Sequence, residues 1–535
     1  MKNSNDPRKQ PRRGPGGRGF LVWFFLLLSF PVFAQEPPDP GAGLFEEESS
    51  PEDEGALYYI RHINFDITGR TRPFALIQRG ELKAGEQLKG KKALEGYIQE
   101  KVQLLVNQRV LETVGIDYTL GAAEEDGAVP VDLLVRVRDT WNIIAIPYPK
   151  YDSNTGFELT IKARDYNFLG TMSPLRIDLG YSLAEDDLWN FGRGAFSFEL
   201  DSDTPFNALG YNWNFNFDHI FSYTYGEPLS YKNVTGISME LPYRWTTFTF
   251  GFEEDFILYE ENKERYKAQY GEHFNGYYFS SELFARWKIP LGLEVFRYGE
   301  LSWTPKLSGK INYRPMGELD DIRKGPALSF DQTLGFGRVN WIGNYRSGAE
   351  ALAENTNVWN FYQASWNSNI SLSLIYHKPF TSFFGISGRF QYRHWFDPYY
   401  PDDYYDEGGD ALRGVLNRSL NTRAMLSLNV DFPLRALRFM PSEWLHNRKL
   451  HFFDFELHAS PFADLALMDA PLNNKKFSPG DMIFSGGLEL ILFPAFMRSI
   501  YLRISLGYNL NEFAAAKKIP SGSNREIFIG LGHFY

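Results

Sequence analysis

"FFDFELHASPFADLAL" (residues 452–467) alternates apolar and polar side chains over most of its length. Successive side chains of a β-strand point to opposite faces, so this segment predicts a strand with one apolar face and one acidic face. The apolar parity holds Phe453, Phe455, Leu457, Ala459, Ala463, Leu465 and Leu467. The polar parity holds Asp454, Glu456, His458, Ser460 and Asp464. The surroundings of this strand must therefore match an apolar surface on one face and an acidic surface on the other.

The same period of two recurs from about residue 155 to the end of the chain. Clear examples are "YNWNFNFD" (211–218), "TRAMLSLNVDF" (422–432) and "SIYLRISLGYNL" (499–510). A soluble β-sandwich also alternates, but its strands average only ~5–6 residues and these run longer. Aromatic side chains also gather near the strand ends, as the two interfaces of a membrane require. A closed barrel with its apolar face outward leaves no backbone edge in lipid, and we favour it.

Dividing this region at its turn-like stretches gives sixteen strands, the first near residue 157 and the last near 524. Bacterial single-chain barrels use even numbers of strands. The region 357–377 can be divided in more than one way. The predicted fold class is therefore membrane all-β, a 16-stranded antiparallel transmembrane β-barrel over residues 150–535.

The N-terminus indicates export. Residues 1–34 combine six Lys/Arg and one Asp with the apolar run "FLVWFFLLLSF" and a small-x-small site before Gln35, which predicts a cleaved signal peptide. Removing them takes the formal net charge from −11 to −16, since 6 − 1 = +5 is lost. This net negative charge does not favour binding to nucleic acid, which is itself negatively charged. The chain has no cysteine, which excludes thiol chemistry.

Residues 35–56 are rich in Pro, Gly and acidic side chains and predict a disordered acidic linker. Residues 57–140 then predict a small α+β domain with the order strand–helix–helix–strand–strand (βααββ). Leu94, Ile98, Val102 and Leu105 recur at helical spacing within it.

Residues 397–420 connect the eleventh and twelfth predicted strands, as the sixth long connection. They contain "DALRGVLNRS" (410–419), in which apolar residues surround an Arg-Gly pair. Carboxylates that face a closed interior need a cation of matched geometry, and the planar guanidinium group supplies it. We hypothesise that this loop folds into the barrel, where Arg413 pairs with Asp464, assisted by Glu456. The alternative is that Arg413 is a solvated loop charge and the acids line a water-filled pore.

"ALRGVLNRSLNTRAMLSLNVDFPL" (411–434) resembles the Arg-Gly-aromatic loop motif of the BamA and two-partner-secretion superfamily, followed by that family's next strand. "FADLA" (462–466) resembles the Phe-x-Asp-x-Gly motif that binds the arginine in that family. Carried over, Arg413 and Gly414 match the loop motif, and Phe462 and Asp464 match the strand motif. Val415 replaces the usual aromatic residue, and Ala466 replaces the usual glycine.

Three further parts of the chain resemble the same superfamily. The domain at 57–140 resembles a POTRA domain, and "YDSNTGFELTIKARDYNFLGT" (151–171) resembles the first barrel strand with its Asn-Phe-Leu-Gly exit. The last residues, "NREIFIGLGHFY", resemble the C-terminal targeting strand of outer-membrane barrels. Gly530 and Tyr535 match that pattern, whereas His533 departs from the expected aromatic residue.

The resemblance implies an assembly or insertion factor in the outer membrane of a diderm bacterium, with the POTRA-like domain in the periplasm. Its partners would be unfolded outer-membrane or secreted client proteins, periplasmic chaperones or accessory lipoproteins, and the lipid bilayer. The alternatives are a two-partner-type transporter for a dedicated client, or a passive porin. We expect no enzymatic activity, cofactor or metal. Calcium binding by the acidic run 402–410 stays an alternative, although it lacks the EF-hand spacing.

Overall fold

The computed structural model describes residues 56–531, except for gaps at 126, 153–155, 184–193, 225–228, 259–275, 295–298, 317–318, 320–322, 397–405, 408–410, 416–420, 471–474 and 512–524. The predicted signal peptide, almost all of the predicted linker and the C-terminal Tyr535 lie outside the described residues. In the part of the chain that the structure describes, no helix is long and apolar enough to cross a bilayer.

A small α+β domain begins the described chain. It contains β1 (Leu57–Thr68), α2 (Pro73–Arg79), β2 (Gln87–Lys89), α3 (Lys91–Asn107), β3 (Leu111–Leu120) and β4 (Ala128–Asp139). The sheet order is β2-β1-β4-β3, with β1 parallel to β4 and the other pairs antiparallel. The order of elements is the predicted βααββ, with the short β2 added between the helices. Helix α3 buries Leu94 and Leu105 completely, because the two residues lie three turns apart on one face.

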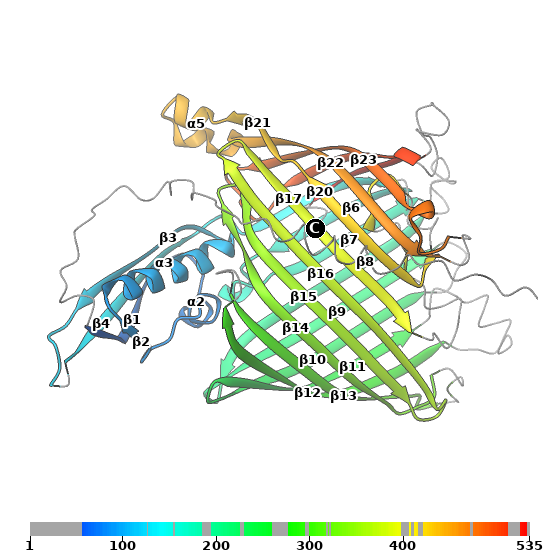
Figure 1. Cartoon of the computed structure of the whole chain (residues 1–535), viewed down its shortest axis with the longest axis horizontal. Helices are drawn as coiled ribbons and strands as arrows, with labels where there is room; N and C mark the ends of the chain where they lie inside the picture. The colour runs from blue at the N-terminus through cyan, green and yellow to red at the C-terminus, as the bar shows by residue number, and fades with distance from the viewer. Residues whose placement is uncertain are drawn as a thin grey trace, which may run out of the picture. The chain divides into compact units, whose positions relative to one another are not determined.

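The rest of the described chain forms one closed antiparallel barrel, whose strands run obliquely around it (Figure 1). In chain order its strands are β5 (Ile143–Asp152), β6 (Gly156–Asp165), β7 (Leu175–Leu183), β8 (Ala195–Ala208), β9 (Tyr211–Thr224), β10 (Ser230–Tyr243), β11 (Thr246–Leu258), β12 (Tyr277–Glu294), β13 (Glu300–Tyr313), β14 (Ala327–Ile342), β15 (Tyr345–Asn360), β16 (Ser365–Thr381), β17 (Phe384–Phe396), β20 (Ala424–Asp431), β21 (Leu434–Phe439), β22 (Phe455–Asp469), β23 (Ile483–Pro494), β24 (Leu502–Asn509) and β25 (Arg525–Leu531). Strand β25 pairs with β5 and closes the ring. A two-stranded ribbon, β18 (Asp406–Glu407) with β19 (Asn421–Thr422), lies outside it in the topology.

The predicted count of sixteen strands is wrong. Both β20 and β21 pair with β17 on one side and β22 on the other, so they are two halves of one strand, interrupted at Pro433, which has no N–H. Among the described residues, the 19 strand segments of the barrel therefore make 18 strands. The barrel also begins at Ile143, earlier than the predicted residue 150, and "GFELTIKARD" is its second strand rather than its first.

Two local features explain the undercount. Strand β5 contains Pro147 and Pro149, and proline inside a run argues against a strand. The turn between β15 and β16 contains no glycine or proline, and its positive φ of 49° falls on Ala364. The loop that carries Arg413 therefore lies between the thirteenth and fourteenth strands, as the seventh rather than the sixth connection on its side. Counted from the C-terminal strand, however, five strands still follow it, as predicted.

Side chains in β22 alternate as the sequence predicts. His458, Ser460, Phe462 and Asp464 are buried in the barrel, whereas the residues between them are half-buried or exposed. Elsewhere the interior carries ion pairs between strands, such as Lys306 with Glu282 at 2.7 Å. An apolar outer surface around a polar, closed interior is the arrangement that a bilayer requires of β-structure.

The "NFLG" segment at the end of β6 holds the small domain. Asn167 is fully buried, and its Nδ2 donates to Thr71 Oγ1 (2.7 Å) and to Asp139 Oδ2 (3.1 Å). Its Oδ1 accepts from the main-chain N–H of Met172 (2.9 Å), and Gly170 O accepts from Arg72 N (2.9 Å). The side chain of Asn167 thus donates to two residues of the small domain and accepts from the segment that follows β6.

We predict that Asn167→Ala loosens the small domain. The substitution removes the bonds to Thr71 and Asp139 and leaves the buried main-chain N–H of Met172 without its acceptor, at about 1–3 kcal/mol. Limited proteolysis of the purified protein should then release the domain faster than in the wild type. Asn207→Ala, which removes an exposed asparagine bond on the β8–β9 hairpin, is the matched control and should leave the rate unchanged. Equal rates for both variants would contradict the assignment.

Candidate functional site

Residues 411–415 of the loop between β17 and β20 are buried inside the barrel. Ala411, Leu412, Arg413 and Val415 are each at most 4% exposed. Leu412 and Val415 belong to one apolar cluster with side chains of β20, β22 and β23, namely Met425, Ala466, Met468 and Ile483. The apolar residues that flank Arg413 in the sequence therefore pack against the inner wall.

Arg413 binds three carboxylates from three neighbouring strands; we call this the Arg413 cluster. Its Nη2 donates to Asp464 Oδ1 (2.6 Å) and its Nε to Asp464 Oδ2 (3.0 Å), a two-point contact that suits the planar guanidinium. The main-chain N–H of Arg413 also donates to Asp464 Oδ2 (2.9 Å). Nη1 donates to Asp431 Oδ1 (2.6 Å) and lies 3.2 Å from Glu489 Oε1. The ring of Phe462 lies 3.7 Å below the guanidinium carbon.

A second arginine extends the cluster toward the last strand. Arg503 Nη1 donates to Glu489 Oε1 (3.0 Å), so Glu489 is shared between two guanidinium groups. The guanidinium of Arg503 lies 4.0 Å from the ring centre of Phe528 on β25. Strand β25 also contacts the loop directly, because Gly414 N donates to Glu526 Oε2 (2.7 Å).

Glycines let the loop backbone lie directly against β24. Gly414 has φ = 91°, and a Cβ there would come within 2.5 Å of Tyr508 N. A Cβ on Gly507 would likewise come within 2.6 Å of Gly414 N. Any side chain at either position would push the loop away from the wall, so Gly414 is needed for its conformation and for its close approach.

Of the predicted site residues, the structure brings together Arg413, Gly414, Phe462 and Asp464. Glu456 is not part of the group, and the expectation that it assists Arg413 is wrong. Eight residues before Asp464 on β22, it lies roughly 26 Å away along an extended strand. There it accepts from Asn344 Nδ2 (3.0 Å) and lies near Arg435 (3.9 Å).

Asp431, Glu489 and Arg503 were missed as members of the cluster. Asp431 belongs to the polar parity of "TRAMLSLNVDF", so the alternation predicts that it faces the interior. Nothing in the sequence, however, indicates that it contacts Arg413. Glu489 is an isolated acid in the apolar run "LELILF" (488–493), a pattern that marks a buried, paired charge. Gly507, a lone glycine within a strand, is the corresponding signal of a close backbone approach.

The two departures from the superfamily pattern fall in one place. Val415, where an aromatic residue is usual, and Ala466, where glycine is usual, belong to the same buried cluster. A smaller side chain in the loop is thus accompanied by a larger one on the strand within the same cluster.

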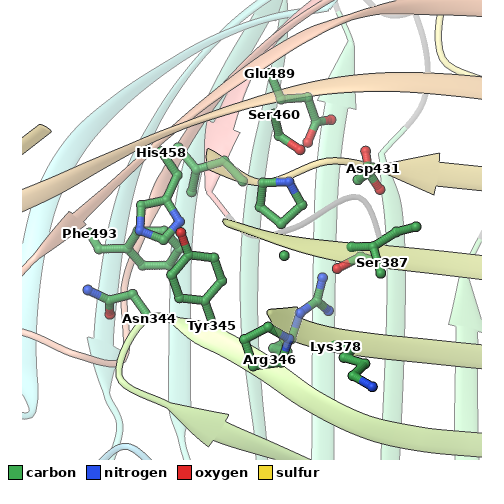
Figure 2. A pocket seen from close by; sticks show the side chains of 15 residues that line it. Asn344, Tyr345, Arg346, Lys378, Ser387, Asp431, His458, Ser460, Glu489 and Phe493 are labelled. Atoms are coloured by element: carbon green, nitrogen blue, oxygen red, sulfur yellow. The ribbon is translucent and has the colours of Figure 1, made fainter. Parts of the chain in front are cut away.

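A pocket lies beside the Arg413 cluster within the barrel. Figure 2 shows Glu489 and Asp431 on one side of it and Arg346 and Lys378 on the other. Three rings form a further wall: His458 lies 4.8 Å from Tyr345 and 4.9 Å from Phe493, measured between ring centres. Charges of both signs line this space, so no single type of ion is favoured in it.

Two predicted features, the terminal Tyr535 and the acidic run 402–410, lie wholly or mostly outside the described residues. Tyr535 lies outside the described residues, whereas Gly530 is buried on β25, with Phe528 and Tyr148 against its Cα. Most of the acidic run 402–410 is also outside them. Among the residues that the structure describes, no group of three or more His, Asp or Glu side chains could hold a metal ion.

The chain matches no protein-family model and no curated protein. In structure it is similar to "CdiB from Acinetobacter baumannii" (14% identity, 89% of this chain and 74% of that one, TM-score 0.44). It is also similar to "CdiB from Escherichia coli" (10%, 90% and 92%, 0.39) and to BamA from Haemophilus ducreyi lacking POTRA domains 1-3 (15%, 89% and 84%, 0.34). All three TM-scores are below 0.5, so these similarities imply no particular function.

We predict that Arg413→Met destabilises the barrel strongly. It removes the cation that Asp431 and Asp464 share and leaves Glu489 with Arg503, and breaking one side of a buried ion pair costs about 3–5 kcal/mol. The measurement is the urea concentration at which the folded, heat-modifiable form is lost in detergent. The matched control is Arg423→Met, which breaks an exposed pair with Asp469 and should cost about 0–1 kcal/mol.

An exchange of charges, Arg413→Asp with Asp464→Arg, should not rescue the fold. The new carboxylate would face Asp431 and Glu489, which stay in place. Full rescue by the exchange, or equal effects of Arg413→Met and the control, would contradict the three-carboxylate cluster.

Proposed function

We propose that the protein is an outer-membrane assembly or insertion factor that receives unfolded client proteins and inserts them through its barrel. The observation that carries the proposal is the short pairing at the seam between the first and last strands. Among the described residues, Phe528 pairs with Asp152 and Ile529 pairs with Tyr151. By contrast, β24 pairs with nearly the whole of β25.

The sequence of β5 explains why this seam is weak. Pro147 and Pro149 have no N–H to donate, and proline in sheets is confined to edge strands and interruptions. A side chain replaces part of the missing pairing, because Tyr148 Oη donates to the main-chain oxygen of Ile529 (3.4 Å). Among the described residues this seam has the fewest residue pairs in the ring, and a short pairing opens at a small free-energy cost, which is what lateral release of a client requires.

The small domain supplies a receptor for unfolded chains under this proposal. Strand β3 is an edge of its sheet and pairs only with β4 among the described residues. An extended client segment can add a strand to such an edge through main-chain hydrogen bonds. The βααββ order supports a POTRA-like role in the periplasm, with chaperones or lipoproteins as further partners. No enzymatic step or cofactor is part of the proposal.

A two-partner-type secretion transporter is the second candidate, since a client can instead pass through the lumen. The Arg413 cluster disfavours free passage, because the loop occupies part of the interior in this structure. A passive porin is disfavoured by the same loop and by the small domain, which a porin does not need.

The test of function is depletion of the protein in its native cell, followed by quantitative proteomics of the outer membrane. A general loss of barrel proteins is expected. Loss of a single secreted protein would instead support the transporter, and loss of small-solute uptake alone would support the porin.

The seam is tested by a disulfide. The chain has no cysteine, so Tyr151→Cys with Ile529→Cys creates one pair whose Cβ atoms lie roughly 5 Å apart in register. The oxidised variant should fail to complement depletion and recover with a reductant. Leu506→Cys with Ile527→Cys, across β24 and β25, is the control that should complement in both states. A seam-locked variant that complements fully would exclude lateral release.

A further inference from the structure

The connection between β21 and β22 (residues 440–454) differs from the other connections at its end of the barrel. Because strands alternate in direction and β5 follows the small domain directly, this connection lies on the small-domain side. Four other connections on that side are only two residues long (209–210, 244–245, 343–344 and 382–383), and the longest of the rest, 166–174, has nine residues. This one instead forms α5 (Pro441–Trp444) and the 3-10 helix η6 (Arg448–Phe453), at the rim beside β21 (Figure 1). We call residues 440–454 the rim hairpin.

The rim hairpin has a defined conformation. Asp454 is buried and accepts from the main-chain N–H of Ser442 (3.0 Å), and its Oδ2 lies 3.0 Å from His451 Nδ1. The side chain of Asn447 accepts from Lys449 N (3.1 Å) and caps η6. These bonds fix the two short helices relative to each other, so the side chains that they expose form a defined surface.

That surface is apolar. The exposed fractions are 58% for Trp444, 67% for Leu445, 64% for Phe452 and 58% for Phe453. Large apolar side chains at such exposure, grouped within ten residues, mark an interaction surface.

The apolar surface continues into the outer face of the barrel. The ring of Phe439, at the end of β21, lies 5.2 Å from that of Trp444 and 5.4 Å from that of Phe455 at the start of β22. Phe439 and Phe455 stand on the outward parity of their strands. The rim hairpin therefore extends the face that the barrel turns toward lipid, with no polar belt between the two.

The exposed charges of the rim hairpin that have no ion pair among the described residues are basic, in a chain of net charge −11. Residues 440–454 carry Arg448 and Lys449 against Glu443 and Asp454, so their net charge is 2 − 2 = 0 with neutral histidines, but Asp454 is buried. Arg438 is paired with Glu443 (2.8 Å). Arg448 and Lys449 are exposed, and neither has an ion pair among the described residues.

We propose that the rim hairpin lies in the bilayer interface on the small-domain side and binds anionic phospholipid headgroups. Trp444, Leu445 and the two phenylalanines enter the boundary between headgroups and acyl chains, while Arg448 and Lys449 bind lipid phosphates. Interfacial segments of other proteins combine aromatic and basic side chains in this way. A second protein is the less suitable occupant, because the surface is continuous with the lipid-facing barrel. The proposal rests on the membrane location of the barrel.

The test uses a single cysteine labelled with an environment-sensitive fluorophore in the full-length protein, reconstituted into vesicles of phosphatidylcholine and phosphatidylglycerol with brominated acyl chains. Leu445→Cys reports on the rim hairpin. Leu334→Cys, an exposed apolar position in the middle of β14, reports on the lipid-facing barrel, and Glu95→Cys on α3 reports on water. No other protein is present, so quenching reports lipid alone.

We expect the Leu445 label to be blue-shifted and quenched nearly as strongly as the Leu334 label, and the Glu95 label to be unaffected. If only Leu334 is quenched, the rim hairpin does not bind lipid and faces water or a protein partner, and the inference is wrong. If neither Leu334 nor Leu445 is quenched, the membrane location of the barrel fails as well.

The headgroup preference is tested with Arg448→Gln and Lys449→Gln together. Each Lys or Arg near an anionic surface contributes about a fivefold preference for anionic over neutral lipid. The double variant should therefore lose most of the difference in Leu445-label quenching between anionic and neutral vesicles. Arg423→Gln, at the opposite end of the barrel, is the control that should retain it. An unchanged preference in the double variant would show that the basic residues bind no headgroup.

Discussion

The burial of one guanidinium group constrains the whole C-terminal part of the barrel. Arg413 is 2% exposed, and such a charge is tolerable only when carboxylates surround it. Those carboxylates come from β20, β22 and β23. Because side chains alternate along a strand, a slip of one residue in any of the three would turn its acid outward. The Arg413 cluster can therefore form only when three neighbouring strands have the correct register.

The same cluster reaches the strand that closes the barrel. Glu526 accepts the N–H of Gly414, and Arg503 joins Glu489 to the ring of Phe528, which is also a seam residue. Among the described residues, β25 is thus held on one side by a long pairing with β24 and by the inserted loop, and on the other by two residue pairs with β5. Under the proposed function, the barrel opens between β25 and β5.

Sequence reasoning found the alternation, the order of elements in the small domain and the pairing of Arg413 with Asp464, because each depends on local period or on a short motif. It did not find the third and fourth members of the cluster. Asp431 and Glu489 lie 18 and 76 residues from Arg413 in the chain, and only the register of β20, β22 and β23 brings them to it. The choice of Glu456 failed for the related reason that parity gives the face of a strand but not the depth along it.

Residues 411–415 lie inside the barrel, held by Arg413 and Gly414. Hydrogen–deuterium exchange of the intact protein in its membrane tests this placement most directly, since the N–H groups of both residues are donated to buried or half-buried carboxylates. Peptides that cover this segment should exchange as slowly as the strands of the barrel. Exchange as fast as that of a solvated surface loop would contradict it.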